Sequence, residues 1–389
     1  VIDLCKSIDL NRILFILHYP PPVHGSSIVG GFIKESRLIN ESFDCHYINL
    51  GTSATVEEIG RNPANKSFRY LRLIWQVKKT LLFFKPDLCY LTLSSAGIGF
   101  YKDALIVLIV RLFGIKRVYH FHNKGVRINQ EKVIDNLLYR LVFENAEVIL
   151  LSKYLYPDVQ KYVPESRVHY CPNGIPDEAG VSRNPQVENH NGKHSLSPLC
   201  AAHLLFLSHL IESKGVFVLV KALKIIKEKG CTFHCIMIGG AGDVTEDQMR
   251  ETIEESGLKG HVDVVGKKYG EEKRTAFEKA DIFVHPTFND CLPLVLIEAM
   301  QHSLPIVSTP EGAIPDIVED GITGFLVPQK DAIAMADKLE VLIKDPDLRK
   351  KMGSAGRAKY EAQFTLERFE RRMVEILTQV AENKISGIR

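Results

Sequence analysis

Two acidic residues, Asp290 and Glu298, lie eight positions apart in the stretch from Ala280 to Pro310. This stretch predicts a short buried strand, a loop, a helix and a second buried strand. Nearly every residue from Leu292 to Met300 is apolar, so we expect the helix to be buried on all sides. An unpaired carboxylate in such a helix is strongly unfavourable. Glu298 should therefore accept hydrogen bonds from the hydroxyl groups of a ligand or from a basic residue.

Asp290 lies in the loop that leads into this helix, where Pro293 fits the first helical turn. Backbone N–H groups and the positive end of the helix dipole gather there, which suits a phosphate or another anionic oxygen. A structural alternative also fits: Asp290 could cap the helix while Glu298 closes an ion pair in the core. The spacing of the two acids does not decide between these roles.

A second candidate group lies in Ser208–Gly215, SHLIESKG, which follows a predicted strand and opens a helix near Val216. His209 and Lys214 lie where a diphosphate would contact the helix N-terminus, although Lys214 also fits an ordinary surface lysine. The later sequence GGAGD is not a dinucleotide fingerprint, because Thr245 stands in place of the third glycine of G-x-G-x-x-G.

In the first half of the chain, His120 and His122 alternate at the end of a predicted strand, so both side chains face the same side. They could hold a metal, as in a metal-dependent hydrolase, or they could be one core and one site histidine. No carboxylate cluster completes a metal site in the sequence, so we expect no metal. Gly25 either allows the backbone to approach a ligand closely or serves a simple turn.

Parallel strands would bring these groups together, and the sequence alternates strand and helix twice over. This alternation predicts an α/β fold of two doubly wound, Rossmann-like domains that face each other across a cleft holding the ligand. The strands are expected at Arg12–Leu17, Cys45–Asn49, Leu88–Leu91, Arg117–Phe121, Val148–Leu151, Val168–Tyr170, Leu204–Leu207, Phe233–Ile238, Val262–Val265, Ile282–His285, Ile306–Ser308 and Phe325–Val327.

The polar run VSRNPQVENHNGKHSLSP separates the two halves of the chain. We expect residues 181–198 to be a linker between a first domain at 1–180 and a second at 199–363. The final segment, 364–389, contains the amphipathic stretch Leu366–Val380, which is expected to form a helix that packs back on the first domain.

Composition narrows the class of protein. With 389 residues, 45% hydrophobic and 25% charged, the chain fits two globular domains, and a net charge of +2 gives no general reason for nucleic-acid binding. Eight cysteines without a paired framework indicate a reducing compartment. The longest apolar run, Ala104–Val110, is too short to span a bilayer. We therefore expect a cytoplasmic protein.

The stretch Arg61–Lys85 contains seven basic residues and no acid. An apolar stripe at helical spacing is expected at Leu71, Ile74, Trp75, Val77, Leu81 and Leu82. Such a segment is typical of an amphipathic helix that packs on a sheet with its charges in water. It is also compatible with docking on an anionic membrane surface, where each Lys or Arg contributes about 1 kcal/mol.

Four segments resemble the signature segments of the retaining, GT-B-fold glycosyltransferases of the large "group 1" family. They are CPNGI, SHLIESKG, FNDCLPLVLIEAM and STPEGAIPDIVEDGITGFLVP. The resemblance implies transfer of a sugar from a nucleotide-sugar donor, held by the second domain, to an acceptor held by the first. It implies that Asp290 contacts the sugar hydroxyls and that Glu298 contacts the ribose.

The same resemblance implies that Lys214 binds phosphate together with His209, which replaces the usual Arg. It also assigns Gly25 to the N-terminal glycine-rich loop and places His122 beside the reacting carbon. The usual first acid is Glu followed by Gly, whereas Asp290 here is followed by Cys291 and Leu292, which we also expect at the donor.

The expected chemistry uses no metal or other cofactor. Lys214, a protonated His209 and helix N-termini would stabilise the leaving nucleoside diphosphate, and attack on the same face would retain the configuration. The acceptor would be a glycan or a lipid-linked diphosphate in cell-surface polysaccharide assembly, met at the inner face of the membrane. Two alternatives stay open: a nucleotide-sugar epimerase on the same scaffold, and a catalytically silent nucleotide-sugar-binding protein.

Overall fold

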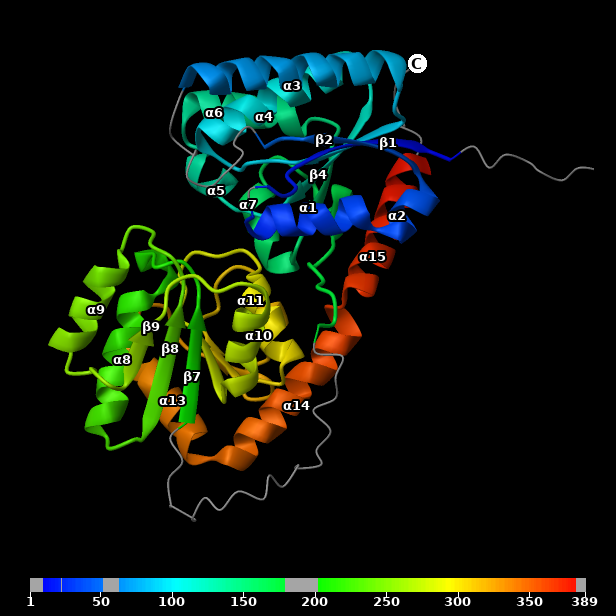
Figure 1. The fold of residues 1–389 in the computed structure, drawn as a ribbon. Coiled ribbons are helices and arrows are strands. Elements are labelled where there is room, and N and C mark those ends of the chain that lie inside the picture. Colours follow the sequence, from blue (N-terminus) through cyan, green and yellow to red (C-terminus); the bar gives the residue numbers. More distant parts are fainter. Residues whose placement is uncertain (1–9, 22, 52–62, 179–201, 383–389) are drawn as a thin grey trace, which may run out of the picture. The chain divides into compact units, whose positions relative to one another are not determined.

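The computed structural model describes residues 10–21, 23–51, 63–178 and 202–382. They form two compact units, each with one parallel six-stranded sheet and helices on both faces (Figure 1). The first unit contains the described residues up to Gly174 and those from Leu366 on. The second unit runs from Ile175 to Thr365.

The sheet of the first unit has the strand order β2-β1-β3-β4-β5-β6, which reverses direction between β1 and β3. Its strands are Arg12–Leu17 (β1), Asp44–Asn49 (β2), Leu88–Thr92 (β3), Lys116–Phe121 (β4), Glu147–Leu150 (β5) and Val168–Tyr170 (β6). Its helices are Gly25–Glu35 (α1), Arg37–Ser42 (α2), Pro63–Phe83 (α3), Gly97–Leu112 (α4), Val126–Asn129 (α5), Val133–Phe143 (α6), Tyr156–Val159 (α7) and Leu366–Glu382 (α15).

The sheet of the second unit has the order β12-β11-β10-β7-β8-β9, which reverses between β7 and β10. Its strands are Ala202–Leu207 (β7), Phe233–Ile238 (β8), Val262–Val264 (β9), Ile282–His285 (β10), Ile306–Ser308 (β11) and Gly324–Leu326 (β12). Its helices are Val216–Glu228 (α8), Glu246–Glu255 (α9), Gly270–Lys279 (α10), Leu294–Gln301 (α11), Ile314–Ile317 (α12), Ala332–Lys344 (α13) and Pro346–Gln363 (α14).

The predicted fold class, α/β with two doubly wound domains, is confirmed. All twelve predicted strands are present, and their ends differ from the predicted ends by at most two residues. The strands can be predicted from the sequence because parallel sheets that are covered on both faces need continuous apolar runs. None of the helices in the described part of the chain has the length and apolar content that a membrane crossing requires.

The apolar stripe predicted for α3 is wrong in detail, because its members lie on two faces of the helix. Val77 and Leu81 are buried, together with Leu73, which the sequence did not single out. Leu71 and Trp75 are both 63% exposed. The exposed large apolar side chains of α3 are Phe68, Leu71, Trp75, Leu82 and Phe83.

Helix α15 belongs to the first unit, where it lies beside α2 (Figure 1). The ammonium of Lys116, in β4, donates to the carbonyl oxygens of Val380 and Ala381 at 3.3 and 2.6 Å. A cation at the C-terminal end of a helix is favourable because the helix dipole is negative there. Arg372 Nε also donates to the carbonyl of Tyr170, at 3.3 Å.

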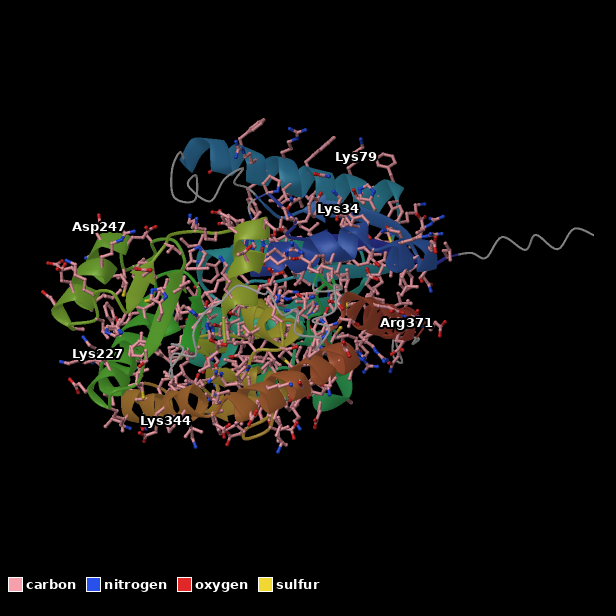
Figure 2. The ribbon with its side chains drawn as sticks, turned by 60° about the horizontal axis from the view of Figure 1, so that its bottom comes forward. Lys34, Lys79, Lys227, Asp247, Lys344 and Arg371 are labelled. Atoms are coloured by element: carbon pink, nitrogen blue, oxygen red, sulfur yellow. The ribbon has the colours of Figure 1, made fainter. Side chains whose placement is uncertain are left out.

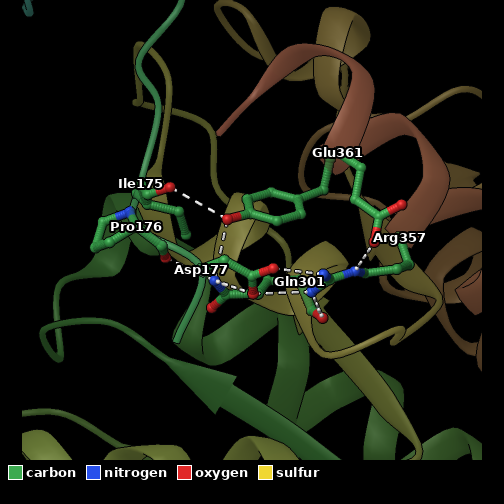
Figure 3. A network of polar contacts seen from close by, with 7 residues as sticks. Ile175, Pro176, Asp177, Gln301, Arg357 and Glu361 are labelled. Carbon is green, nitrogen blue, oxygen red and sulfur yellow. Dashed lines mark hydrogen bonds and ion pairs between the residues drawn. The ribbon is translucent and has the colours of Figure 1, made fainter. Parts of the chain in front are cut away.

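A polar network holds the segment where the chain enters the second unit (Figure 3). Arg357 of α14 forms a two-pronged contact with Asp177, at 3.1 Å to Oδ1 and 2.6 Å to Oδ2. Gln301, at the end of α11, donates from Nε2 to the carbonyl oxygen of Pro176 at 2.7 Å, and Arg357 donates to the carbonyl of Gln301 at 3.0 Å. The entry segment is thus fixed by both α11 and α14.

The boundary between the two units lies after Gly174, whereas the sequence placed the end of the first domain at residue 180. Ile175 donates its N–H to the carbonyl of Phe364 at 3.0 Å and forms a bridge with Thr365, so the two chain crossings lie side by side. Ile175, Pro176 and Asp177 therefore belong to the second unit. The predicted linker, 181–198, lies outside the described residues.

We predict that Arg357→Met lowers the free energy of unfolding by roughly 1.5–3 kcal/mol, because it removes the charged donor that Arg357 supplies to the Asp177 carboxylate and to the Gln301 carbonyl. Urea denaturation measures this change. Arg371→Met is the control, since its pair with Glu367 on α15 is exposed and should contribute less than about 0.5 kcal/mol (Figure 2). Equal losses in both variants would contradict the anchoring role.

Candidate functional site

Two loops of the second unit meet at the carboxyl ends of β7 and β10, where the sheet reverses its order. The loop after β7 passes through the short 3₁₀ turn Glu212–Lys214 into α8. The carbonyl oxygen of Ser213 accepts hydrogen bonds from the Phe288 N–H at 2.9 Å and from Thr287 Oγ1 at 3.2 Å, both in the loop after β10. Doubly wound sheets bind ligands at such a point of reversal, so these loops form the candidate site.

Two glycines allow the close approach of the loops. Gly215 has φ +79, and a Cβ there would lie 2.1 Å from the carbonyl oxygen of Pro286. Gly312 has φ +54, and its Cβ would lie 2.5 Å from the carbonyl oxygen of Asp290. Both positions combine a left-handed backbone with contact against another backbone, so only glycine fits without strain.

Lys214, Asp290 and His285 form one polar cluster in these loops. Lys214 Nζ lies 2.7 Å from Asp290 Oδ2 and donates to the carbonyl of Asn289 at 3.1 Å. His285 Nε2 lies 3.0 Å from the same Oδ2, and because an ionised carboxylate only accepts, Nε2 carries the proton. The structure thus brings two residues predicted in separate loops into direct contact.

The environment of Asp290 stabilises its ionised form. Burial alone would raise its pKa, but the hydrogen bond from His285 and the charge of Lys214 outweigh burial and hold the pKa at about 2. The alternative that Asp290 caps α11 is wrong: the N-cap residue is Pro293, which was expected in the first turn, and no side chain caps this helix.

Glu311 holds the Asp290 loop from its other side. Its Oε1 accepts the backbone N–H of Asp290 at 3.2 Å, and its Oε2 accepts from Gln329 Nε2 at 2.7 Å. The next residue, Gly312, lies against the same loop. The carboxylate of Glu311 therefore fixes the backbone that carries Asp290.

Glu298 lies on a side of α11 that is only half-buried, together with Leu294 and Val295. The prediction that this helix is buried on all sides is therefore wrong. Oε1 of Glu298 lies 2.6 Å from Lys273 Nζ of α10, which supplies one of the two kinds of partner that the sequence predicted. The contact also fits the structural alternative of a core ion pair. Oε2, however, is shielded from water and has no hydrogen-bond partner among the described residues.

Cys291 and Leu292, expected at the donor, have buried side chains. The carbonyl oxygen of Cys291 accepts the N–H of Ala313 at 2.6 Å, which ties this loop to the loop that follows β11. Any contact of these two residues with a ligand would therefore come mainly from their backbone.

His209 is exposed at the end of β7, and its pKa lies below the usual 6.5. Neighbouring protein removes water from part of the ring, and the ammonium groups of Lys267 and Lys214 further disfavour a third positive charge. His209 is therefore neutral in the ligand-free protein at neutral pH, and its expected protonation beside a leaving diphosphate stays a prediction. The positive charge of the candidate site comes from the lysines.

In the first unit, His120 and His122 lie with ring centroids 4.1 Å apart, on one face of the sheet as predicted. His120 is fully buried and its Nδ1 lies 2.7 Å from Tyr90 Oη, so it is the core histidine. Neither ring nitrogen of His122 has a hydrogen-bond partner among the described residues. Burial, then the charges of His18 and His24, lower its pKa to about 3, so His122 is neutral.

Gly25 begins α1, and His24 caps this helix by accepting the N–H of Ser27 at its Nδ1, 3.3 Å away. A Cβ at Gly25 would meet nothing within 4 Å, so the start of α1 is open. Within the described ranges, no three His, Cys, Asp or Glu side chains are grouped as metal ligands would be.

The residues of the second-unit site fall inside a family match. Residues 193–359 match the family model described as Glycosyl transferases group 1, a range that contains Lys214, Asp290 and Glu298. This part of the chain is therefore similar to the group 1 glycosyltransferases.

Two curated relatives show where the likeness lies. Amylovoran biosynthesis glycosyltransferase AmsK of Erwinia amylovora is 34% identical over 184 residues, which are 46% of this chain and 45% of AmsK. Capsular polysaccharide biosynthesis glycosyltransferase CapM of Staphylococcus aureus is 30% identical over 163 residues, 41% of each chain. The chain therefore spans less than half the length of either glycosyltransferase.

Solved glycosyltransferases share the fold over a greater length. A glycosyltransferase from Rickettsia africae superposes with a TM-score of 0.70 at 17% identity, covering 97% of this chain and 100% of that one. Anabaena Alr3699/HepE in complex with UDP-glucose gives a TM-score of 0.66 at 17% identity, covering 95% and 99%. At this identity the likeness shows the fold alone.

Three residues of this site were not predicted from the sequence: His285, Glu311 and Lys273. His285 ends a predicted strand beside Asp290, so its position was a signal that could have been used. Glu311 and Lys273 act through contacts with residues distant in sequence, for which the chain carries no local signal.

We predict that Asp290 makes the stability of the protein pH-dependent in acid. Its folded-state pKa, about 2, lies below the unfolded value of 3.8, so its contribution is present above pH 4 and is lost as the pH falls towards 2. The stability difference between wild type and Asp290→Asn, measured by urea denaturation, should shrink over the same range. Asp347→Asn, an exposed acid on α14, should give a difference that is small and constant. A constant difference for Asp290→Asn would contradict the ion-pair assignment.

Proposed function

We propose that the protein is a glycosyltransferase that moves a sugar from a nucleotide-sugar donor to an acceptor with retention of anomeric configuration. The observation that carries this proposal is the contact between Lys214 and Asp290 at the reversal point of the second sheet, within the range of the family match. An ammonium and a carboxylate held together offer a contact for phosphate and an acceptor for sugar hydroxyls.

Several observations support a nucleotide sugar as the donor. HepE, which shares the fold, was solved with UDP and with UDP-glucose. In this chain, Lys214 lies at the loop leading into α8 and Asp290 at the loop leading into α11, so both helix N-termini direct N–H groups towards the same loops. Glu298, the fifth residue of α11, has an unpartnered Oε2 among the described residues and is proposed to contact the ribose.

Lys214 can bind phosphate without releasing Asp290. An ammonium has three N–H donors, of which Asp290 and the carbonyl of Asn289 occupy two. The third remains for a phosphate oxygen. As the bond to the sugar breaks, negative charge grows on the diphosphate, and Lys214 and the start of α11 stabilise it electrostatically. The proposed chemistry includes no metal or other cofactor.

Retention rests on the resemblance to retaining enzymes, in which the acceptor attacks the face that the diphosphate leaves. No carboxylate is assigned as a nucleophile. Asp290 would orient the sugar hydroxyls. His122, a neutral imidazole with two ring nitrogens available, can donate one hydrogen bond and accept another, which suits positioning of the donor sugar or the acceptor.

The names of the relatives direct the proposal towards cell-surface polysaccharides. AmsK and CapM carry names that place them in the biosynthesis of amylovoran and of capsular polysaccharide. A glycan or a lipid-linked sugar diphosphate is therefore the acceptor class that we propose.

We predict that Lys214→Ala weakens nucleoside diphosphate binding by roughly 1.5–3 kcal/mol, the range for hydrogen bonds to charged groups. A thermal-shift panel of UDP, GDP, ADP, CMP and their sugars first identifies the base. A ligand at 100 times its Kd adds about 2.7 kcal/mol of stability. Titration calorimetry then compares Lys214→Ala with Lys224→Ala, an exposed lysine of α8. Unchanged affinity in folded Lys214→Ala would refute the phosphate contact.

We also propose that the first unit meets its acceptor at the inner face of an anionic membrane, which makes the enzyme peripheral to it. The exposed side of α3 mixes large apolar side chains with Lys78 and Lys79, and Lys79 Nζ lies 5.4 Å from the centroid of the Trp75 ring (Figure 2). Helix α4 packs beside both α3 and α6. Further exposed apolar side chains lie on α4 and α6, at Ile98, Leu105, Leu112, Val133, Ile134 and Leu137.

Such a surface combines the two forces that hold proteins on bilayers, apolar burial and attraction to anionic lipid. We predict that the protein co-sediments with liposomes, more with anionic lipid and less with salt. The triple change of Lys78, Lys79 and Lys85 to Glu should remove the preference for anionic lipid. The matched control changes three exposed lysines of the second unit, Lys221, Lys224 and Lys350, to Glu. Equal recovery of the protein with neutral and with anionic liposomes would contradict the membrane proposal and would favour a soluble acceptor.

A further inference from the structure

Helices α10 and α11 of the second unit meet at two successive helical turns. Phe277 of α10 stacks on His302, the C-cap residue directly after α11, with ring centroids 5.1 Å apart and planes within 7°. One turn earlier in both helices, Lys273 Nζ lies 2.6 Å from Glu298 Oε1. Residues four apart share one face of a helix, so the stacked rings fix the place where Lys273 meets Glu298.

The Lys273–Glu298 pair leaves one carboxylate oxygen unused. The two side chains are 26% and 21% exposed, yet Oε2 of Glu298 is out of contact with water. No described residue donates a hydrogen bond to it. A shielded carboxylate oxygen without a donor is unfavourable, so Oε2 needs a donor that the described residues do not supply.

We propose that Lys273 is a positioning residue for nucleotide recognition. Its ammonium holds Oε1 of Glu298, and this turns Oε2 towards a hydroxyl group of the donor's ribose. The inference rests on the proposed function, because it assigns a ribose to Glu298. It adds that this site selects ribonucleotides over nucleotides that lack the contacted hydroxyl, and that the selection depends on Lys273.

A purely structural ion pair would behave differently. The Phe277–His302 stack already joins the two helices, so removal of the Lys273 ammonium need not separate them. If Lys273 only stabilised the packing, its loss would weaken all nucleotides equally. If it orients Glu298, its loss weakens only nucleotides that carry the hydroxyl. The ligand therefore separates the two roles.

The test measures the affinity of UDP, GDP and ADP, each beside its 2′-deoxy and 3′-deoxy forms, by titration calorimetry on the full chain. Wild type should bind the preferred ribonucleotide about tenfold or more tightly than at least one deoxy form, as for a hydrogen bond to a charged group. Lys273→Met should weaken the ribonucleotide about tenfold and leave that deoxy form within about twofold.

Glu298→Gln and the double variant complete a cycle. Since both changes disturb one contact, the double variant should bind no more weakly than the weaker single variant. Lys259→Met is the matched control, because Lys259 forms a pair of the same length, 2.6 Å, with Glu254 at the exposed end of α9. It should leave all affinities unchanged. Should Lys273→Met fail to fold, Lys273→Gln, which keeps a donor of shorter reach, carries the same comparison.

The outcomes distinguish the two proposals. If wild type binds none of the nucleotides, the proposed function itself fails. If wild type binds them but Lys273→Met weakens ribonucleotide and deoxy forms equally, or neither, then Lys273 has no positioning role and this inference alone is overturned. Selective loss of the ribonucleotide, absent in Lys259→Met, supports it.

Discussion

The ion pair between Lys214 and Asp290 is the contact on which the candidate site depends. Taking two charges out of water is favourable only when their other hydrogen-bonding groups are also satisfied. Here the carbonyl of Asn289 accepts from Lys214, and His285 donates to Asp290. Glu311 then fixes the backbone of Asp290. Each of these partners lies at the carboxyl end of a strand, either in the last position of the strand (His285) or in the loop that follows, so the sheet order itself places the charges.

Helix α11 connects this pair to the rest of the second unit. Asp290 precedes it, Glu298 lies in its middle, and Gln301 at its last residue holds the segment by which the chain enters the unit. A site built on a short rigid helix keeps its groups in fixed relative positions better than one built on loops alone. One helix thus carries the candidate ribose contact, Glu298, and the side chain that holds the entry segment, Gln301. A displacement of the entry segment would therefore act on the helix that carries Glu298.

The sequence predicted the strands well because parallel sheets covered on both faces need apolar runs, such as Ile282–His285, that no other element explains as simply. It predicted Lys214 and Asp290 because each precedes a helix after a strand. It could not predict that they touch, nor that Lys273 reaches Glu298, because these contacts depend on how distant elements pack. The prediction of the α3 stripe failed for a related reason. The helix carries apolar residues at helical spacing on more than one face, and only packing against neighbouring elements decides which face is buried.

The charge of His209 depends on the same kind of information. An imidazole in place of a guanidinium removes a permanent cation, and the sequence suggested that protonation would restore it. Burial, and then the charges of Lys267 and Lys214, oppose that protonation in the ligand-free protein. A bound diphosphate would favour the imidazolium, because its negative charge offsets both ammonium groups. In the proposed donor site, His209 would thus gain its proton together with the ligand, and the replacement of arginine would make the charge of the site conditional on occupancy.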